Sequence, residues 1–356
     1  MTRAPHDLSD ADAAPPDAST RATVQTAIPL ADPELADRLG ARMAVVEDAL
    51  AQAVGNADAL ADDVSRHLVT AGGKRLRPML TFLAGELGDG ARPEIVDAAV
   101  VVELTHLASL YHDDVMDSAP LRRGAPSAHS VWGNTVAILV GDLLFARASA
   151  LVAGLGPEAV LLQARTFERL CLGQLHETTG PGADEDPVEH YLQVLADKTA
   201  SLLSTSARLG ARFGGSGPDV EDTVGAYGEK LGVAFQLADD VLDLASTGEE
   251  SGKTPGTDLR EKVPTMPVLL LRSRVVRGEA KPGDDQLLGL LDGDLSSDEA
   301  LADAVEKLRG HEVVAETREL AARWAEEAAA ELAPLPAGPV KDALEQFATV
   351  LADRAV

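Results

Sequence analysis

The protein has 356 residues, of which 45% are hydrophobic and only 3% are aromatic. Its 31 basic and 58 acidic side chains give a formal net charge of −27, which argues against nucleic acid as a partner and against an electrostatic hold on anionic lipid, because both need a basic face. Alanine and leucine dominate the apolar fraction and both favour helices, so we expect a mainly helical protein with a solvated acidic surface.

The cysteine content and the hydropathy pattern indicate a cytoplasmic protein. The one cysteine, Cys171, excludes an internal disulfide and favours a reducing compartment, and its apolar neighbours predict a buried structural thiol. No uninterrupted apolar run approaches the ~18 residues of a spanning helix; the longest include 136–140 and 268–271. The N-terminus carries several aspartates and no apolar stretch. We therefore expect no secretory signal and no transmembrane segment.

In chain order, a tail comes first and helices follow. Residues 1–30 are rich in Ala, Pro, Asp, Ser and Thr without periodicity, so we expect a disordered tail, with one domain over 31–356. From Asp32 apolar residues recur at three- and four-residue steps, and a second helix runs to about Leu68. Further helices, mostly separated by Pro or Gly, are predicted from near 78 and at about 93–116, 129–153, 157–178, 187–212, 218–246, 264–276, 297–308, 312–333 and 338–354. No period-two alternation appears, so no sheet is predicted.

Two of the long helices end in matching acidic sequences of the form DDxxD. On a helix, the first and last aspartates of such a motif share one face. One such cluster could be a solvated helix end, but two on long apolar helices are better explained by a bound cation. Oxygen ligands favour Mg²⁺, and zinc ligands are lacking nearby. The predicted metal ligands are Asp113, Asp114, Asp117, Asp239, Asp240 and Asp243.

Basic residues stand out in so acidic a chain, at positions where they could hold phosphates. Arginine offers a two-pronged donor fork to phosphate, and lysine a point charge. Any single one could be a surface charge, but each lies beside a glycine, a threonine or an acidic motif. The basic segments are GGKRLRP at 72–78, LRRG at 121–124, Lys198-Thr199, Lys253-Thr254 and Lys262.

The ordered set of motifs resembles the trans-isoprenyl diphosphate synthases, and most of all the bacterial medium- and long-chain members. The matching segments are GGKRLRP, LTHLASLYHDDVMD, LRRG, Lys198-Thr199 and FQLADDVLD, and the resemblance covers about residues 35 to 355. It implies an all-α fold, a single large antiparallel helical bundle around a central active-site cavity, usually homodimeric. It also implies isopentenyl diphosphate and an allylic diphosphate (geranyl or farnesyl) as substrates and Mg²⁺, about three ions per site, as cofactor.

The resemblance also implies roles for individual residues. Asp113, Asp117, Asp239 and Lys198 would act in catalysis. Arg122, Lys198, Thr199, Gln236 and Lys253 would hold the allylic diphosphate. Lys74, Arg77, His106 and Arg123 would hold isopentenyl diphosphate. From the pattern alone His106 also fits a core histidine. The role of Lys262 stays open, because Glu261 stands where the family often has a glycine.

The chemistry implied is ionisation of the allylic diphosphate, attack by the double bond of isopentenyl diphosphate on the carbocation, and loss of a proton. No motif side chain is an obvious base, and the departing diphosphate is one possibility. The residues five and four positions before Asp113 are Ala108 and Ser109, where members of the family that stop at fifteen carbons usually have a bulky aromatic. We therefore expect a product of about C30 to C50 for a quinone side chain such as that of menaquinone, since small side chains leave room for a longer chain.

Four alternatives remain. If Ala108 and Ser109 are small only because two helices cross closely, the product would be geranylgeranyl diphosphate (C20). A terpene cyclase usually has a different second metal motif and has little use for GGKRLRP. A membrane prenyltransferase would need several spanning helices. A non-catalytic subunit of a heteromeric synthase would be expected to have lost metal aspartates, and all six are present.

Overall fold

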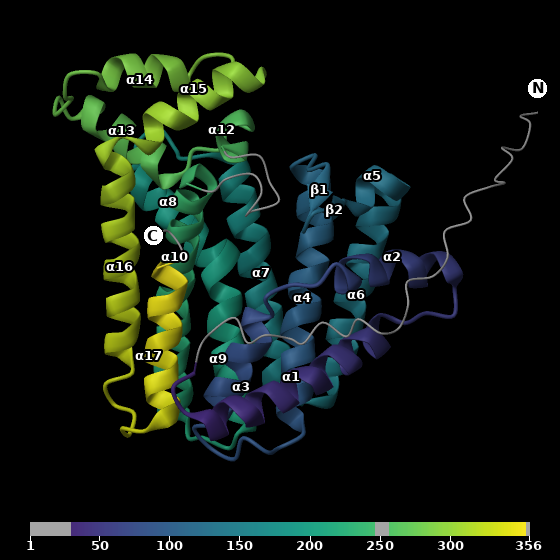
Figure 1. The fold of residues 1–356 in the computed structure, drawn as a ribbon. Coiled ribbons are helices and arrows are strands. Elements are labelled where there is room, and N and C mark those ends of the chain that lie inside the picture. Colours follow the sequence, from purple (N-terminus) through teal and green to yellow (C-terminus); the bar gives the residue numbers. More distant parts are fainter. Residues whose placement is uncertain (1–29, 246–255, 354–356) are drawn as a thin grey trace, which may run out of the picture.

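The computed structural model describes residues 30–245 and 256–353. The predicted tail, apart from residue 30, lies outside this part of the chain, and so does Lys253. The described residues are almost entirely helical, which confirms the all-α prediction (Figure 1). The elements are α1 (Pro33–Val54), α2 (Ala59–Thr70), α3 (Leu76–Gly85), α4 (Glu94–Met116), β1 (Leu121–Arg122), β2 (Ala125–Pro126), α5 (Ala128–Trp132), α6 (Asn134–Gly154), α7 (Pro157–Thr179), α8 (Pro187–Leu195), the π-helix η1 (Ala196–Ala200), α9 (Ser201–Phe213), α10 (Pro218–Ala245), α12 (Thr257–Arg260), α13 (Met266–Val276), α14 (Asp284–Leu291), α15 (Asp298–Arg309), α16 (Glu312–Glu331) and α17 (Pro339–Ala352).

Local chemistry explains where the helices begin. Asp32 caps α1, and its side chain accepts a hydrogen bond from the backbone N–H of Leu35 at 2.7 Å. Pro33 occupies the first turn, where its missing N–H costs nothing. Asp58 and Asp186 cap α2 and α8 in the same way. The helical pattern predicted from Asp32 therefore begins where the structure places the cap of α1.

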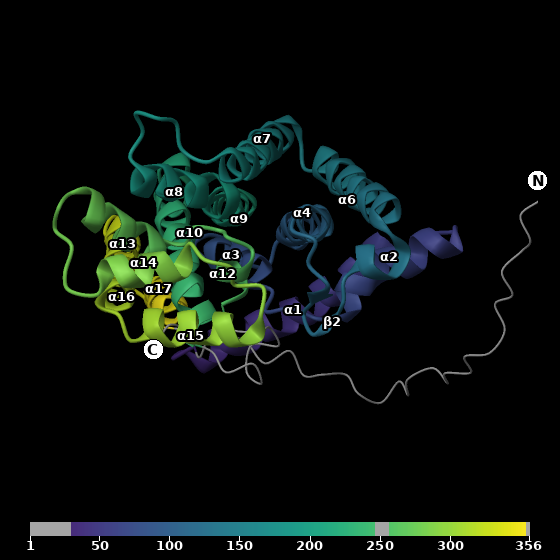
Figure 2. The ribbon, with the colours of Figure 1, turned by 90° about the horizontal axis from the view of Figure 1, so that it is seen from above.

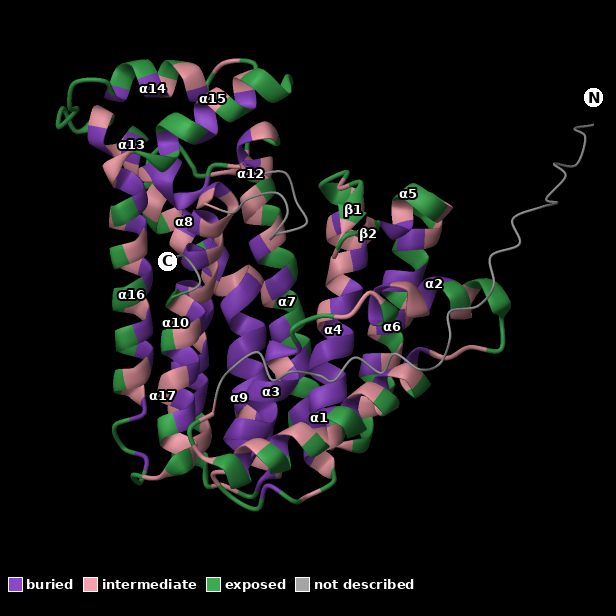
Figure 3. Cartoon of the chain, in the orientation of Figure 1, coloured by how far each residue is buried: buried purple, intermediate pink, exposed green. Residues whose placement is uncertain are grey.

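The core runs through the middle of the bundle. Helix α4 is buried on nearly all sides, and α3, α6, α9 and α10 pack around the same large apolar cluster. A second cluster joins α8 and α10 to α13 and the helices that follow. Figure 2, seen from above, shows the helices end-on, and Figure 3 shows buried residues concentrated on α3, α4, α9 and α10. The two helices that end in acidic motifs, α4 and α10, are thus held rigidly by packing on several sides.

The structure departs from the predicted elements in several places. A short antiparallel hairpin, β1–β2, corrects the expectation of no sheet: Arg123 (φ 54°) and Gly124 (φ 77°) form a left-handed two-residue turn that needs no long strands. Gly133 (φ 83°) separates α5 from α6, so the helix predicted at 129–153 is two. The helix predicted at 187–212 contains η1, and α14 was not predicted.

One further expectation, that of a buried Cys171, was wrong, and the apolar character of α4 and α6 bears on another, the predicted absence of a transmembrane segment. Cys171 is exposed rather than buried, because its apolar neighbours Leu172 and Leu175 lie 42% and 55% exposed on the outside of α7. By length and composition α4 and α6 could each cross a membrane; the search for uninterrupted runs missed them because both helices contain interspersed polar residues. In α4 67% of the apolar window is buried in the bundle, and in α6 only 33%.

Candidate active site

The two acidic motifs end the helices α4 and α10 and lie at the same end of the bundle, the upper end in Figure 1. Asp113 is partly buried and Asp117 is exposed at the C-cap of α4. Burial raises the pKa of Asp113 to about 6; the positive charge of Lys198 opposes this and the neighbouring Asp117 adds to it. A crowded carboxylate with a raised pKa is one that a cation would stabilise.

The second aspartate of each motif is turned inward. Asp114 is fully buried, and Arg122 donates to it from Nε at 2.6 Å. Asp240 is also buried, and it accepts from the Tyr191 hydroxyl at 2.9 Å and from the backbone N–H of Met266 at 3.0 Å. Burial raises the pKa of both carboxyl groups. These two aspartates therefore anchor the motifs to the protein.

The donor set fits magnesium. The partly buried aspartates Asp113, Asp239 and Asp243 and the exposed Asp117 present oxygen ligands at one end of the bundle. In the described part of the chain no three His, Cys, Asp or Glu side chains are already grouped as a metal site. Mg²⁺ usually takes one or two carboxylates together with substrate phosphates, and this arrangement supplies that kind of site.

The two arginines of the β1–β2 hairpin, Arg122 and Arg123, bond to different parts of the protein. Arg122 pairs with Asp114. Arg123 donates to the backbone carbonyls of Leu68, at 2.9 Å, and of Gly72. A Cβ at Gly73 would lie 2.9 Å from the Arg123 guanidinium carbon, so a larger residue would displace that side chain, and the φ of 151° at this position also favours glycine. Arg123 thus holds the loop that carries Lys74.

A positively charged cluster gathers the residues predicted for isopentenyl diphosphate. Burial lowers the pKa of Arg77 to about 10, and its Nε has no hydrogen-bond partner. Burial also lowers the pKa of His106 well below its usual value, and the nearby charges of Arg77, Arg123 and Arg122 lower it further. His106 thus lies among arginines that include two of the same predicted set, Arg77 and Arg123, and Lys74 is exposed on the loop before α3. A buried guanidinium such as that of Arg77 is a group that a bound diphosphate would stabilise.

Arg75 was missed by the sequence analysis. It precedes α3 with a left-handed backbone (φ 47°) and is buried, pairing with Glu103 on α4 at 2.7 Å and with Glu47 on α1 at 2.6 Å. Its guanidinium is used inside the protein, so it fixes from within the loop that precedes α3. A glutamate at 103 within the apolar run of α4 was the available signal.

Three of the five residues predicted for the allylic diphosphate lie together on η1 and α10, next to α7: Lys198, Thr199 and Gln236. Thr199 donates to the Gln236 side chain at 3.2 Å. Lys198 forms an ion pair with Glu177 on α7, a residue that the sequence analysis did not select. Burial lowers the pKa of Lys198, but Glu177 and Asp113 outweigh it and leave the pKa raised. Lys198 is therefore charged and faces the first acidic motif.

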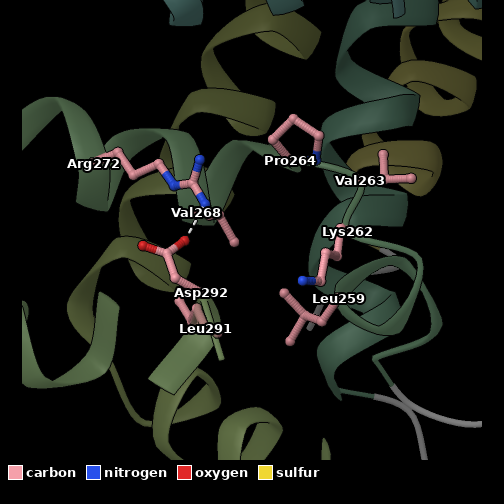
Figure 4. Close-up of a pocket in the computed structure, with 8 residues that line it drawn as sticks. All are labelled: Leu259, Lys262, Val263, Pro264, Val268, Arg272, Leu291 and Asp292. Carbon is pink, nitrogen blue, oxygen red and sulfur yellow. Dashed lines mark hydrogen bonds and ion pairs between the residues drawn. The ribbon is translucent and has the colours of Figure 1, made fainter. Parts of the chain in front are cut away.

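Lys262 lies elsewhere. With φ 58° it adopts the left-handed conformation that glycine favours, and it lines a small pocket of about 150 Å³ (Figure 4). The pocket is closed on the other side by Arg272 and Asp292, which pair at 2.6 Å. None of the residues that line it belongs to the acidic motifs or to the cationic clusters.

Comparison with known proteins agrees with this geometry. The family model described as polyprenyl synthetase matches residues 58–308. The nonaprenyl diphosphate synthase of Mycobacterium tuberculosis is 43% identical over 326 residues, which cover 91% of this chain and 96% of that protein. A solved polyprenyl synthase from Caulobacter crescentus, complexed with calcium and isoprenyl diphosphate, has a TM-score of 0.82 at 32% identity and covers 90% of this chain and 97% of that one.

A second solved structure, geranylgeranyl pyrophosphate synthase from Corynebacterium glutamicum with calcium and isoprenyl diphosphate, has a TM-score of 0.79 at 41% identity. It covers 92% of this chain and 99% of that one. The present chain belongs to the polyprenyl synthetase family of prenyltransferases.

Proposed function

We propose that the protein catalyses the head-to-tail (1′-4) condensation of isopentenyl diphosphate with an allylic diphosphate, giving an all-trans polyprenyl diphosphate. The observation that carries this proposal is the pair of separate cationic sets beside the acidic motifs. Arg77, with the His106 ring beside it, forms one, and Lys198 with Thr199 forms the other. Two diphosphates need two such sets, whereas a terpene cyclase binds one.

We assign magnesium, about three ions, to Asp113, Asp117, Asp239 and Asp243, with Asp114 and Asp240 holding the helix ends from behind. Bound metal would neutralise the leaving diphosphate. The two related structures that were solved with calcium and isoprenyl diphosphate support the use of a divalent ion.

The side chains of this protein would then act in two groups, one at each diphosphate. Lys198 and Arg122 add positive charge where the allylic carbon–oxygen bond breaks and its electron pair leaves with the diphosphate. Arg77, His106 and Lys74 hold isopentenyl diphosphate so that its double bond can attack the carbocation. The proton lost from the new chain passes to an acceptor outside the acidic motifs, for which the departing diphosphate is our candidate.

For product length we propose about C30 to C50, serving a quinone side chain such as that of menaquinone. Ala108 is buried and Ser109 is partly buried, and both side chains are small. Neither would block a growing chain as a bulky aromatic side chain would. The similarity to a nonaprenyl diphosphate synthase supports this length. The C20 alternative has support too: a Cβ on Gly141 of α6 would lie 3.2 Å from the Ala108 carbonyl oxygen, so α4 and α6 do cross closely, and the Corynebacterium glutamicum relative is a geranylgeranyl synthase.

We further propose a cytoplasmic homodimer. Large apolar side chains lie exposed along the outer faces of α6 and α7, among them Leu139 at 61% and Leu161 at 50%. Phe167 and Leu172 lie on the same two helices. An apolar face of this kind is typical of a surface that a second copy covers. Sedimentation of the purified chain would test it, with a dimer expected and a monomer contradicting it.

The function is tested by mixing the purified chain with isopentenyl diphosphate and farnesyl diphosphate and measuring released inorganic diphosphate. Release should require both substrates and Mg²⁺ and should stop when EDTA is added. Release from farnesyl diphosphate alone would indicate a cyclase. No release from the chain alone, followed by activity after a second subunit is added, would indicate a component of a heteromeric synthase.

A further inference from the structure

The π-helix η1 interrupts the run from α8 to α9 at the two residues, Lys198 and Thr199, that face the allylic diphosphate. Its closing hydrogen bond runs from the N–H of Ser201 to the carbonyl of Ala196, five residues back. Neighbouring side chains diverge by about 100° in an α-helix. The wider π turn reduces this divergence, so Lys198 and Thr199 can face one site together.

A π turn changes the hydrogen bonding of the backbone carbonyls within it. Here side chains donate hydrogen bonds to two of these carbonyls. The Ser201 hydroxyl donates to the Asp197 carbonyl at 2.6 Å. Arg169 on α7 donates to the Ala196 carbonyl at 3.0 Å and to the Asp197 carboxylate at 2.7 Å. The same guanidinium bonds both oxygens of Glu229 on α10, at 2.5 and 3.0 Å. One arginine therefore ties η1 to both neighbouring helices.

Two glycines let those helices approach the turn. A Cβ at Gly173 on α7 would lie 2.6 Å from the Lys198 nitrogen and 3.0 Å from its Cα. A Cβ at Gly232 on α10 would overlap the Cα of Ala200. Both neighbours are backbone or atoms next to it, which cannot rotate away. The turn is therefore clamped between α7 and α10 at its beginning and its end.

We infer that Arg169, Gly173 and Gly232 are positioning residues: they hold η1 as a π turn and thereby aim Lys198 and Thr199 at the allylic diphosphate. The inference rests on the proposed function, because it assumes that these two residues bind that substrate. None of the three touches the diphosphate in this account; they act through the backbone of residues 196–200.

The first test is Gly173→Ala against the matched control Gly40→Ala, a helical glycine on α1 with nothing within 4 Å of an added Cβ. Gly173→Ala should raise the KM for farnesyl diphosphate or lower kcat by about tenfold or more, with the KM for isopentenyl diphosphate changed less than about twofold, as expected when positioning at one site is lost. Gly40→Ala should leave both constants unchanged. Equal effects of Gly173→Ala on both substrates, or none on either, would overturn the inference.

The second test uses Arg169→Gln, with Arg169→Lys as the conservative rescue. Arg212 on α9 provides the control, because it too bonds a glutamate of α10 through a two-pronged contact, here Glu221 at 2.7 and 2.9 Å, and is 27% exposed against 36% for Arg169. Arg169→Gln should weaken binding of farnesyl diphosphate, measured by calorimetry with Mg²⁺, by about five- to tenfold, as expected for loss of charged hydrogen bonds. Arg169→Lys should recover part of it, and Arg212→Gln should have no effect.

These measurements separate the inference from the proposed function. Wild-type protein that neither binds farnesyl diphosphate nor elongates it refutes the proposed function. Wild-type protein that does both, while Arg169→Gln only lowers the melting temperature and leaves binding unchanged, refutes the positioning role alone.

Discussion

The two acidic motifs have nearly the same sequence, yet their second aspartates are held differently. Asp114 is fixed by a cation, Arg122, at 2.6 Å, whereas Asp240 is fixed by neutral donors, the Tyr191 hydroxyl and the N–H of Met266. A partly buried charged group such as Arg122 is destabilised when its counter-ion is removed, whereas the neutral Tyr191 hydroxyl and Met266 N–H need no counter-ion. The first motif should therefore be the more sensitive to loss of charge.

The largest effect is expected at the outward aspartates of both motifs. Asp113→Ala or Asp239→Ala should lower kcat by several powers of ten, because loss of metal-held contacts to the leaving group removes several kcal/mol of transition-state stabilisation at about 1.4 kcal/mol per tenfold. Steady-state rates with circular dichroism as a folding control check this. Near-wild-type turnover in either folded variant would show that the motif does not hold the metal.

The contrast between charged and neutral anchoring extends to Arg75. Arg75→Leu would leave Glu103 buried without a cation and should cost about 3 to 5 kcal/mol of stability, measured by urea unfolding. Adding Glu103→Gln should recover part of that loss. Arg38→Leu, which breaks an exposed pair with Glu86, should cost less than about 1 kcal/mol. Equal losses in Arg75→Leu and Arg38→Leu would mean that the buried network contributes little.

The sharpest comparison of the motifs replaces each inward aspartate by asparagine. Asp114→Asn should lower kcat by about ten- to a hundredfold, since a bond between charged groups contributes about 1.5 to 3 kcal/mol and Arg122 would lose its counter-ion. Asp240→Asn should cost less than about threefold, because an amide oxygen can still accept from both Tyr191 and Met266. The reverse order of effects would contradict the contrast drawn between the motifs.

A smaller effect separates the two diphosphate sites. Lys74→Ala should raise the KM for isopentenyl diphosphate by about tenfold, and Lys198→Ala should chiefly impair use of the allylic substrate, since each removes one charge–phosphate contact of roughly 1.4 kcal/mol. Initial rates with each substrate varied in turn would show the split. If both variants changed only the constant for the same substrate, the division into two sites would be wrong.

Local signals in the sequence predicted much of this molecule. Asp32 and Pro33 mark the start of α1, and apolar periodicity gave most of the other helices to within a few residues. The spacing of Asp113 and Asp117 gave one face of α4. Each of these features depends on residues close together in the chain, which is why sequence alone sufficed.

What sequence could not give depends on contacts between distant elements. The inward turn of Asp240 follows from Tyr191 on α8 and Met266 on α13. The π turn at Lys198 follows from how closely α7 and α10 approach, and an α-helical pattern continues through it. Cys171 was misjudged because its apolar neighbours belong to an outer face, and periodicity does not distinguish a core from an apolar surface.

The central claim is that the two motifs and the two cationic sets together extend an allylic chain. The most direct measurement is chromatography of the dephosphorylated products that the purified chain makes from farnesyl diphosphate, labelled isopentenyl diphosphate and Mg²⁺. We expect all-trans products of about C30 to C50, shortened in Ala108→Phe, because a ring there would block a path lined by small side chains. A single C20 product would refute the long-chain proposal, and no extended product from folded, metal-loaded protein would contradict the account.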